Sequence, residues 1–185
     1  MRNLLTGKIW RVTAALVLLA VAGCNSGGES ETPAGTVDNS GVGVAGGDLA
    51  PNFKLDKVDG GTLELYSLRG KVVLVDFWDT WCPPCKKALP HLQELSVEYK
   101  DDLVVVGVAF GRYGQKAVSD YVQQNGLTFE MVMSDPNFKV AQDFGGVQSI
   151  PTTFLIDAEG HILKQWTGYN DKSVYEAGIK QALGS

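Results

Sequence analysis

The chain has 185 residues, of which 44% are hydrophobic and 20% charged, and this composition excludes an intrinsically disordered, collagen-like or multi-span membrane protein. With 16 basic against 21 acidic residues the formal net charge is −5, the wrong sign for electrostatic binding to phosphate backbones, so we expect no nucleic-acid partner. Three cysteines are too few for a disulfide scaffold, but Cys82 and Cys85 lie only three residues apart. The length predicts one folded domain.

The amino-terminal segment has the pattern of a secretory signal. Three basic residues and no acidic one precede an apolar run of eleven residues at 12–22, which is too short for the ~20 residues of a membrane-spanning helix. The stretch Val21-Ala22-Gly23-Cys24 resembles a bacterial lipobox, in which the cysteine thiol receives diacylglycerol and becomes the first residue after cleavage. We therefore expect a signal peptide at 1–23 and a lipid anchor at Cys24, with ordinary signal cleavage near Cys24 as the alternative.

A tether is expected between the anchor and the folded domain. Residues 25–48 contain seven glycines and three serines and have no periodic apolar pattern, which is typical of a flexible linker. A linker of this length has an r.m.s. span of about 25–30 Å. The predicted organisation is therefore a lipidated cysteine and tether at 24–48, followed by a domain at 49–185 that is held outside the cytoplasm at a membrane, on the periplasmic side in a Gram-negative cell.

The domain is expected to open with a β-hairpin, because alternating stretches at 53–55 and 62–65 flank Asp59-Gly60-Gly61. Residues 71–78 form a nearly continuous apolar run, typical of a strand buried on both faces, with Asp76 as its one anomaly.

Helical spacing of apolar residues then runs from Cys82 to Tyr99, and Pro90 within it predicts a kink. The remaining elements, in chain order, are a strand at 103–110, a helix around 117–122 that ends at Asn125-Gly126, a strand at 129–133, a helix from Asp135-Pro136 to Phe144, strands at 152–156 and 161–167, and a helix from Asp171 to about Leu183. Strands that alternate with helices before a closing hairpin predict a three-layer α/β domain with its parallel strands in the centre.

The cysteine pair directly follows a buried strand and begins a helix, and this context makes C-x-x-C a redox hypothesis. Unpaired N–H groups and the helix dipole favour a thiolate there, lowering the thiol pKa from its free value of about 8.5. We expect Cys82 to be the exposed nucleophile that attacks a partner disulfide, and Cys85 to be the buried thiol that resolves the mixed disulfide. Asp76 fits as the proton relay to Cys85, since a buried carboxylate has a raised pKa; a solvated or salt-bridged acid at the strand end is the alternative.

Two cysteines at this spacing can also serve other purposes. A structural disulfide is the alternative for the pair itself. A zinc site would need more ligands, and the only other thiol or imidazole side chains in the mature chain are Cys24, His91 and His161. No histidine follows Cys85, which excludes C-x-x-C-H haem attachment, and no G-x-G-x-x-G loop is present for a nicotinamide cofactor. We therefore expect no metal, and no cofactor beyond the redox-active cysteine pair and the lipid.

Three motifs together resemble thioredoxin-fold proteins: Val75–Trp78, Trp81-Cys82-Pro83-Pro84-Cys85 and Gly146–Thr152. Within that superfamily the chain most resembles the membrane-tethered TlpA-like and ResA-like thiol-disulfide oxidoreductases, a match that Ala50–Phe53 and the extra helix and strand at 117–133 support. The resemblance implies a thioredoxin-like three-layer sandwich with an N-terminal β-hairpin and an inserted helix-strand unit.

The resemblance also implies a substrate site. Pro151 would be cis, and the backbone at Ile150 would face Cys82 and pair with an extended partner peptide, while Trp81, Pro83 and Pro84 would form the rest of the rim. One departure concerns the position three residues after Cys85, where ResA-like proteins have an acidic residue and this chain has Ala88. This departure weakens the assignment of cytochrome c apoprotein as the substrate.

The expected function is that of a membrane-tethered, extracytoplasmic thiol-disulfide oxidoreductase, a monomeric domain that reduces disulfides of exported proteins, with apocytochrome c among the candidate substrates and a membrane thiol-transfer protein as electron donor. An oxidant or isomerase of exported proteins is one alternative. Another is a peroxiredoxin-like peroxidase. Peroxiredoxins have Thr or Ser three residues before the peroxidatic cysteine and Pro seven residues before it, whereas this chain has Asp79 and Val75 at these positions. The third is a non-catalytic lipoprotein that binds a partner.

Overall fold

The computed structural model describes residues 42–43 and 47–184. The elements of this part of the chain are β1 (Val42–Gly43), β2 (Lys54–Asp56), β3 (Thr62–Glu64), the 3-10 helix η1 (Leu65–Leu68), β4 (Val72–Trp78), α1 (Pro83–Glu98), β5 (Leu103–Ala109), α2 (Gln115–Gln124), β6 (Glu130–Met133), α3 (Lys139–Asp143), β7 (Thr152–Ile156), β8 (Ile162–Thr167) and α4 (Lys172–Leu183). Apart from β1 and η1, which the sequence does not predict, the elements follow in the order that the sequence predicts.

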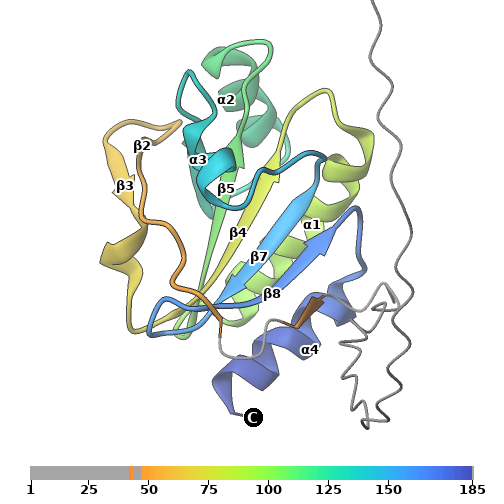
Figure 1. The fold of residues 1–185 in the computed structure, drawn as a ribbon. Helices are drawn as coiled ribbons and strands as arrows, with labels where there is room; N and C mark the ends of the chain where they lie inside the picture. Colours follow the sequence, from red (N-terminus) through yellow and green to blue (C-terminus); the bar gives the residue numbers. More distant parts are fainter. Residues whose placement is uncertain (1–41, 44–46, 185) are drawn as a thin grey trace, which may run out of the picture. The chain divides into compact units, whose positions relative to one another are not determined.

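The main sheet has the strand order β1-β8-β7-β4-β5-β6. Strands β4, β5 and β6 are parallel neighbours, whereas β7 pairs antiparallel with β4 and with β8. Buried side chains of α1, α2 and α4 form one hydrophobic cluster with the sheet, and those of α3, η1 and the β2–β3 hairpin form a second cluster. Figure 1 shows the sheet between these layers. The predicted three-layer α/β sandwich, with its hairpin and inserted α2–β6 unit, is thus confirmed.

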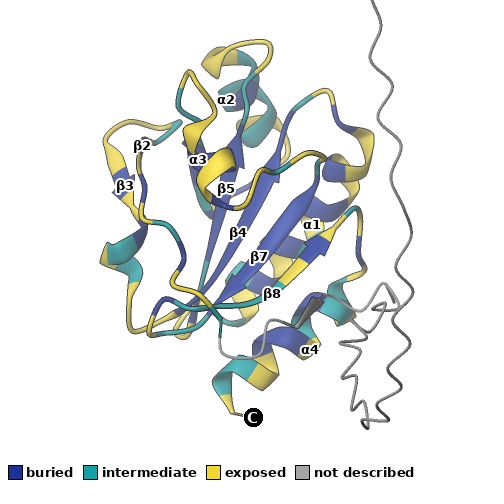
Figure 2. Ribbon diagram, viewed as in Figure 1, coloured by how far each residue is buried: buried dark blue, intermediate teal, exposed yellow. Residues whose placement is uncertain are grey.

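Strand β4 lies in the middle of the sheet and is buried along its whole length, as Figure 2 shows. Because side chains of a strand alternate between the two faces, Val72, Leu74 and Trp78 pack on the α1 side and Val73, Val75 and Phe77 on the α3 side. This alternation places Asp76 on the face that α1 and α4 cover. The chain leaves β4 at its C-terminal end and enters α1 within a few residues, so the cysteine motif lies at the C-terminal end of this central strand.

Helix α3 begins later than the sequence predicts. Asp135-Pro136 was expected to start the helix, but its first residue is Lys139 and residues 136–137 form a turn. The Asp135 carboxylate still caps it, accepting hydrogen bonds from the backbone N–H groups of Asn137, Lys139 and Val140 at 3.2, 2.8 and 2.9 Å. An acidic side chain can reach amides two to five residues ahead, which the local pattern does not distinguish from an adjacent cap.

The paired part of the chain begins before residue 49, the predicted domain boundary. Val42 and Gly43, within the predicted tether, pair with Gln165 and Lys164 of β8. This two-residue strand is made by backbone pairing at a sheet edge, which requires no apolar periodicity and so gives no sequence signal. The predicted signal peptide and Cys24 lie outside the described residues. Among the helices of the described part, none is both long and apolar enough to cross a membrane.

Candidate active site

Cys82 and Cys85 form a disulfide at the N-terminus of α1, with their Cα atoms 5.3 Å apart. Cys82 is the N-cap residue, and its sulfur accepts a hydrogen bond from the backbone N–H of Cys85 at 3.2 Å. Pro83 and Pro84 fit the first turn because N–H groups there have no partner within the helix. Cys85 is fully buried one turn into the helix.

Cys82 is less accessible than the sequence predicts, since only 2% of the residue is exposed in this disulfide form. Its sulfur lies 3.6 Å from the carbonyl oxygen of Ile150. A disulfide sulfur carries no hydrogen, so this is a packing contact that covers the sulfur. Ile150 belongs to the loop between α3 and β7, far from Cys82 along the chain, and its peptide bond to Pro151 is cis. The expected position of the Ile150 backbone opposite Cys82 is therefore what the structure has.

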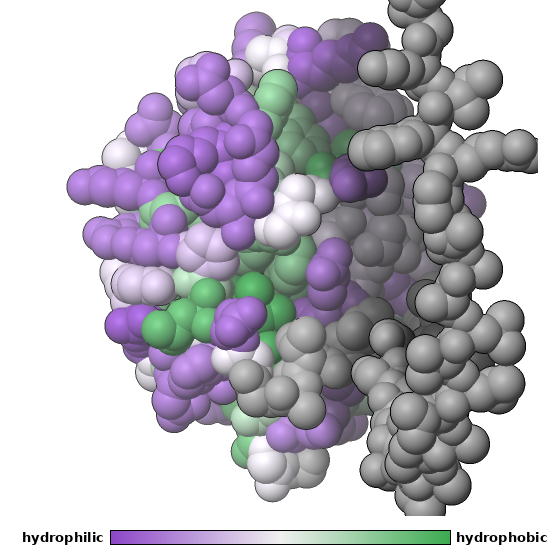
Figure 3. Space-filling model, viewed as in Figure 1, coloured by the Kyte–Doolittle hydropathy of each residue, from purple (hydrophilic) through white to green (hydrophobic). Residues whose placement is uncertain are grey.

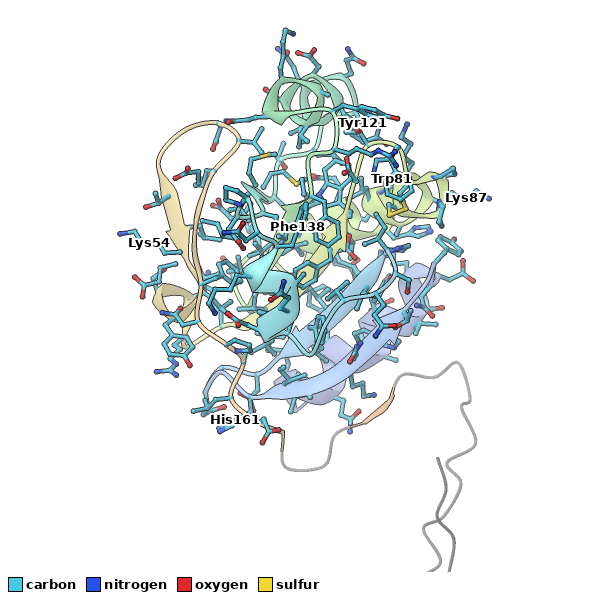
Figure 4. All side chains as sticks on the ribbon, turned by 45° about the horizontal axis from the view of Figure 1, so that its top comes forward. Lys54, Trp81, Lys87, Tyr121, Phe138 and His161 are labelled. Atoms are coloured by element: carbon cyan, nitrogen blue, oxygen red, sulfur yellow. A yellow bond between two sulfur atoms is a disulfide. The ribbon has the colours of Figure 1, made fainter. Side chains whose placement is uncertain are left out.

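An exposed rim surrounds the disulfide. Pro83 and Pro84 are exposed, Ile150 is half-buried and Pro151 is buried, while 44% of Trp81 is exposed. Figure 4 shows the disulfide sulfur beside Trp81, with Lys87 beyond it along α1. These residues therefore lie beside both the disulfide and the segment that carries Ile150.

Asp76 is completely buried on β4. One carboxylate oxygen accepts a hydrogen bond from the Thr153 hydroxyl at 2.8 Å, and the other has no hydrogen-bond partner among the described residues. Burial raises the pKa of Asp76 to about 7, although the Thr153 hydrogen bond acts in the opposite direction. The carboxyl group therefore exchanges protons near neutral pH, which suits a relay.

A buried tyrosine continues this polar group. The Tyr175 hydroxyl lies 3.4 Å from the Thr153 hydroxyl oxygen. Burial, the larger cause, and the charge of Asp76, the smaller one, together raise the pKa of Tyr175 to about 12. Tyr175 therefore stays protonated at neutral pH and is available as a donor. No local sequence pattern marks Thr153 or Tyr175 as a neighbour of Asp76. Thr153 on β7 and Tyr175 on α4 come close to Asp76 only in the folded chain.

Asp79 is a second buried carboxylate, for which the sequence pattern predicts no role in the site. Its two carboxylate oxygens accept hydrogen bonds from the backbone N–H groups of Thr80, at 2.6 Å, and Arg112, at 2.9 Å. Its backbone carbonyl accepts from the N–H of Cys82 at 3.1 Å. Asp79 thus joins the loop before the cysteines to the loop after β5. An acid three residues before a C-x-x-C motif is the only local signal for it. No cluster of three or more potential metal-ligating side chains occurs within residues 47–184.

Comparison with known proteins agrees with this geometry. The model of the AhpC/TSA family matches residues 46–165. The thiol-disulfide oxidoreductase ResA of Bacillus thuringiensis is 36% identical over 135 residues, which cover 73% of this chain and 77% of that protein. ResA of Bacillus subtilis is also 36% identical, over 71% of this chain and 72% of that protein.

Solved structures show the same fold. The crystal structure of the exposed lipoprotein thioredoxin Etrx1 from Streptococcus pneumoniae is similar with a TM-score of 0.62 and 30% identity, covering 71% of this chain and 99% of that one. The family match, the identity with the ResA proteins and the disulfide at the start of α1 agree. The chain therefore belongs to the AhpC/TSA family of the thioredoxin superfamily and is a ResA-like thiol-disulfide oxidoreductase.

Proposed function

We propose that this oxidoreductase reduces disulfides of exported proteins while tethered to a membrane through a lipid on Cys24. The observation that carries the proposal is the Cys82–Cys85 disulfide at the N-terminus of α1, beneath the Ile150 carbonyl and beside the exposed rim. The lipobox-like stretch supports the tether, and the similar pneumococcal protein is named an exposed lipoprotein. These features together favour an extracytoplasmic protein substrate.

In the proposed reaction Cys82, as a thiolate, attacks one sulfur of a substrate disulfide. This forms a mixed disulfide and releases the first substrate thiolate. Cys85 then gives its proton to Asp76, and its thiolate attacks the Cys82 sulfur. The Cys82–Cys85 disulfide forms, the second substrate thiolate leaves and takes up a proton, and the substrate has gained two electrons.

The substrate is proposed to lie in an extended conformation along Trp81, Pro83 and Pro84 and to pair with the backbone at Ile150 before Pro151. Apocytochrome c is the candidate client that the ResA resemblance brings, although Ala88 stands where ResA-like proteins have an acidic residue. A further dithiol protein in the membrane is the proposed electron donor, because each turnover leaves the cysteine pair oxidised.

The full chain should reduce a model protein disulfide such as that of insulin. Cys82→Ser is expected to abolish reduction, and Cys85→Ser is expected to accumulate a mixed disulfide at Cys82, seen as a mass increase that a reductant reverses. Undiminished reduction by Cys82→Ser would overturn the assignment of the nucleophile.

The reduction potential of the Cys82–Cys85 pair tests the direction of electron flow. A value near or below about −230 mV supports a reductase, whereas one near about −120 mV would make the protein an oxidant. Rapid turnover of hydrogen peroxide would instead favour the peroxidase alternative, for which the AhpC/TSA family match is the specific observation.

A further inference from the structure

A cavity of about 400 Å³ lies beside the rim of the active site, and its walls are largely apolar. Its lining includes Trp81 from the loop before the cysteines, Phe110 and Arg112 from the loop after β5, and Phe138 and Val147 from the segments on either side of α3. Figure 4 shows Phe138 and Trp81 on the same side of the molecule, with the disulfide next to Trp81. The face in Figure 3 is mostly hydrophilic, with hydrophobic surface showing only in patches.

Phe138, which lines the cavity, has an unfavourable backbone conformation. Phe138 adopts left-handed backbone angles, φ 53° and ψ 30°, and is the one non-glycine residue of the described chain with a positive φ. An aromatic residue pays a steric cost there. The residue is nevertheless 47% exposed, and its ring meets the Phe110 ring edge-on, with centroids 5.5 Å apart. Core packing therefore does not account for a phenylalanine at this position.

Arg112 supplies the positive charge of this cavity. Its guanidinium carbon lies 5.6 Å from the centroid of the Trp81 ring, and it forms no ion pair within residues 47–184. Its backbone N–H is held by the buried carboxylate of Asp79. The loop is thereby fixed, while the exposed Arg112 side chain lines the cavity together with Asp79, whose two carboxylate oxygens already accept backbone N–H groups. The guanidinium group is therefore the charge in this lining that complements a negative group of a ligand.

The cavity adjoins the redox site, because Trp81 belongs to both and Val147 in its lining is three residues before Ile150. A polypeptide extended along Ile150 advances about 3.3 Å per residue, so a side chain a few positions from the reacting cysteine would reach the cavity. We infer that this cavity is a specificity subsite that binds a large apolar side chain, preferably aromatic, near the substrate cysteine and next to an acidic residue that pairs with Arg112. This inference rests on the proposed function, since it requires a polypeptide disulfide as substrate.

The test uses the reduced full chain and synthetic peptides, each of which carries one cysteine in a mixed disulfide with glutathione. One phenylalanine is moved through the three positions on each side of that cysteine, and serine at the same position is the reference. The ratio of the two second-order rate constants is measured by quenched flow. We expect one or two positions at which phenylalanine raises the rate about tenfold, the effect of burying part of an aromatic side chain. In a peptide with phenylalanine at such a position, glutamate in place of glutamine next to the phenylalanine should raise the rate constant further.

Variants identify the cavity as the cause. Phe138→Asn removes the ring but keeps a residue that tolerates left-handed backbone angles, so it should fold and lose most of the phenylalanine preference. Its matched control is Tyr113→Asn, which removes the aromatic ring of a residue that is 65% exposed and does not line the cavity. Arg112→Gln should abolish the glutamate preference and keeps the backbone N–H bond to Asp79; its control is Lys87→Gln on the exposed side of α1.

The outcomes separate this inference from the proposed function. A wild-type chain that reduces neither peptide contradicts the proposed function itself. Equal rates for phenylalanine and serine at every position, with both peptides reduced, overturn only the subsite. The subsite is also overturned if Phe138→Asn keeps the wild-type ratio, or if Tyr113→Asn loses it to the same extent.

Discussion

Replacement of Asp76 by asparagine should flatten the pH dependence of the stability of the oxidised protein. The carboxyl group is fully buried, and burial raises its pKa from 3.8 to about 7. Between these two values the folded state binds more protons than the unfolded state, so the free energy of unfolding falls as the pH rises. The stabilising contribution of the protonated carboxyl is thus present at low pH and is lost as the pH rises to about 7.

The size of the effect follows from the shift. Each pKa unit corresponds to about 1.4 kcal/mol, so a shift of this size predicts that the wild-type chain loses about 2–3 kcal/mol between pH 5 and pH 8 through this group alone. Asparagine keeps an oxygen acceptor for the Thr153 hydroxyl but puts an NH₂ donor where the second carboxylate oxygen has no partner. That unsatisfied donor lowers stability equally at every pH, and only the pH-dependent difference is diagnostic.

Urea unfolding, followed by tryptophan fluorescence at pH 5, 6, 7 and 8, measures this difference. The absence of reductant keeps Cys82 and Cys85 in their disulfide, so neither thiol titrates. Asp76→Leu, which has no ionisable group either, is the control and should show the same slope as Asp76→Asn. Parallel wild-type and Asp76→Asn curves across this range would show that Asp76 is ionised throughout, and the relay argument would lose its basis.

Three further substitutions test individual contacts. Thr153→Val removes the hydrogen bond that opposes the burial effect, so the pKa of Asp76 should rise further, as measured by infrared difference spectroscopy of its carboxyl band; an unchanged pKa would contradict the contact. Gly107→Ala should lower the free energy of unfolding by about 1–3 kcal/mol, because a Cβ atom there would lie 2.5 Å from the Met131 sulfur, and wild-type stability in urea would mean that the neighbours yield freely. Asp135→Ala should cost about 1 kcal/mol at pH 7 as the cap of α3 is lost. Although burial alone would raise the pKa of Asp135, backbone hydrogen bonds lower it, so the difference from wild type should shrink as the pH falls through its folded-state pKa; a difference independent of pH would argue against the cap.

Short-range patterns in the sequence were sufficient to predict most of the helices and strands and their order. The continuous apolar run of β4, the helical spacing after Cys82 and the turn residues at Gly60 and Gly126 act over a few residues, so the elements could be predicted in order. The position of C-x-x-C between a strand and a helix likewise predicted the disulfide site. The start of α3 was predicted wrongly because a capping carboxylate reaches amides two to five residues ahead, and β1 gave no signal because backbone pairing alone forms it.

Only the tertiary structure decided what surrounds the cysteines. Parallel pairing of β4 with β5 brings the loop that carries Arg112 beside Asp79, and the turn before α3 adds Phe138 to the same wall. In the same way Thr153 reaches Asp76 from 77 residues away along the chain. These contacts depend on strand register and on the crossing of distant segments, which short-range periodicity does not encode. The cysteine pair and the buried Asp76 could therefore be identified from the sequence, whereas the residues that contact Asp76 and those that line the cavity emerged only with the fold.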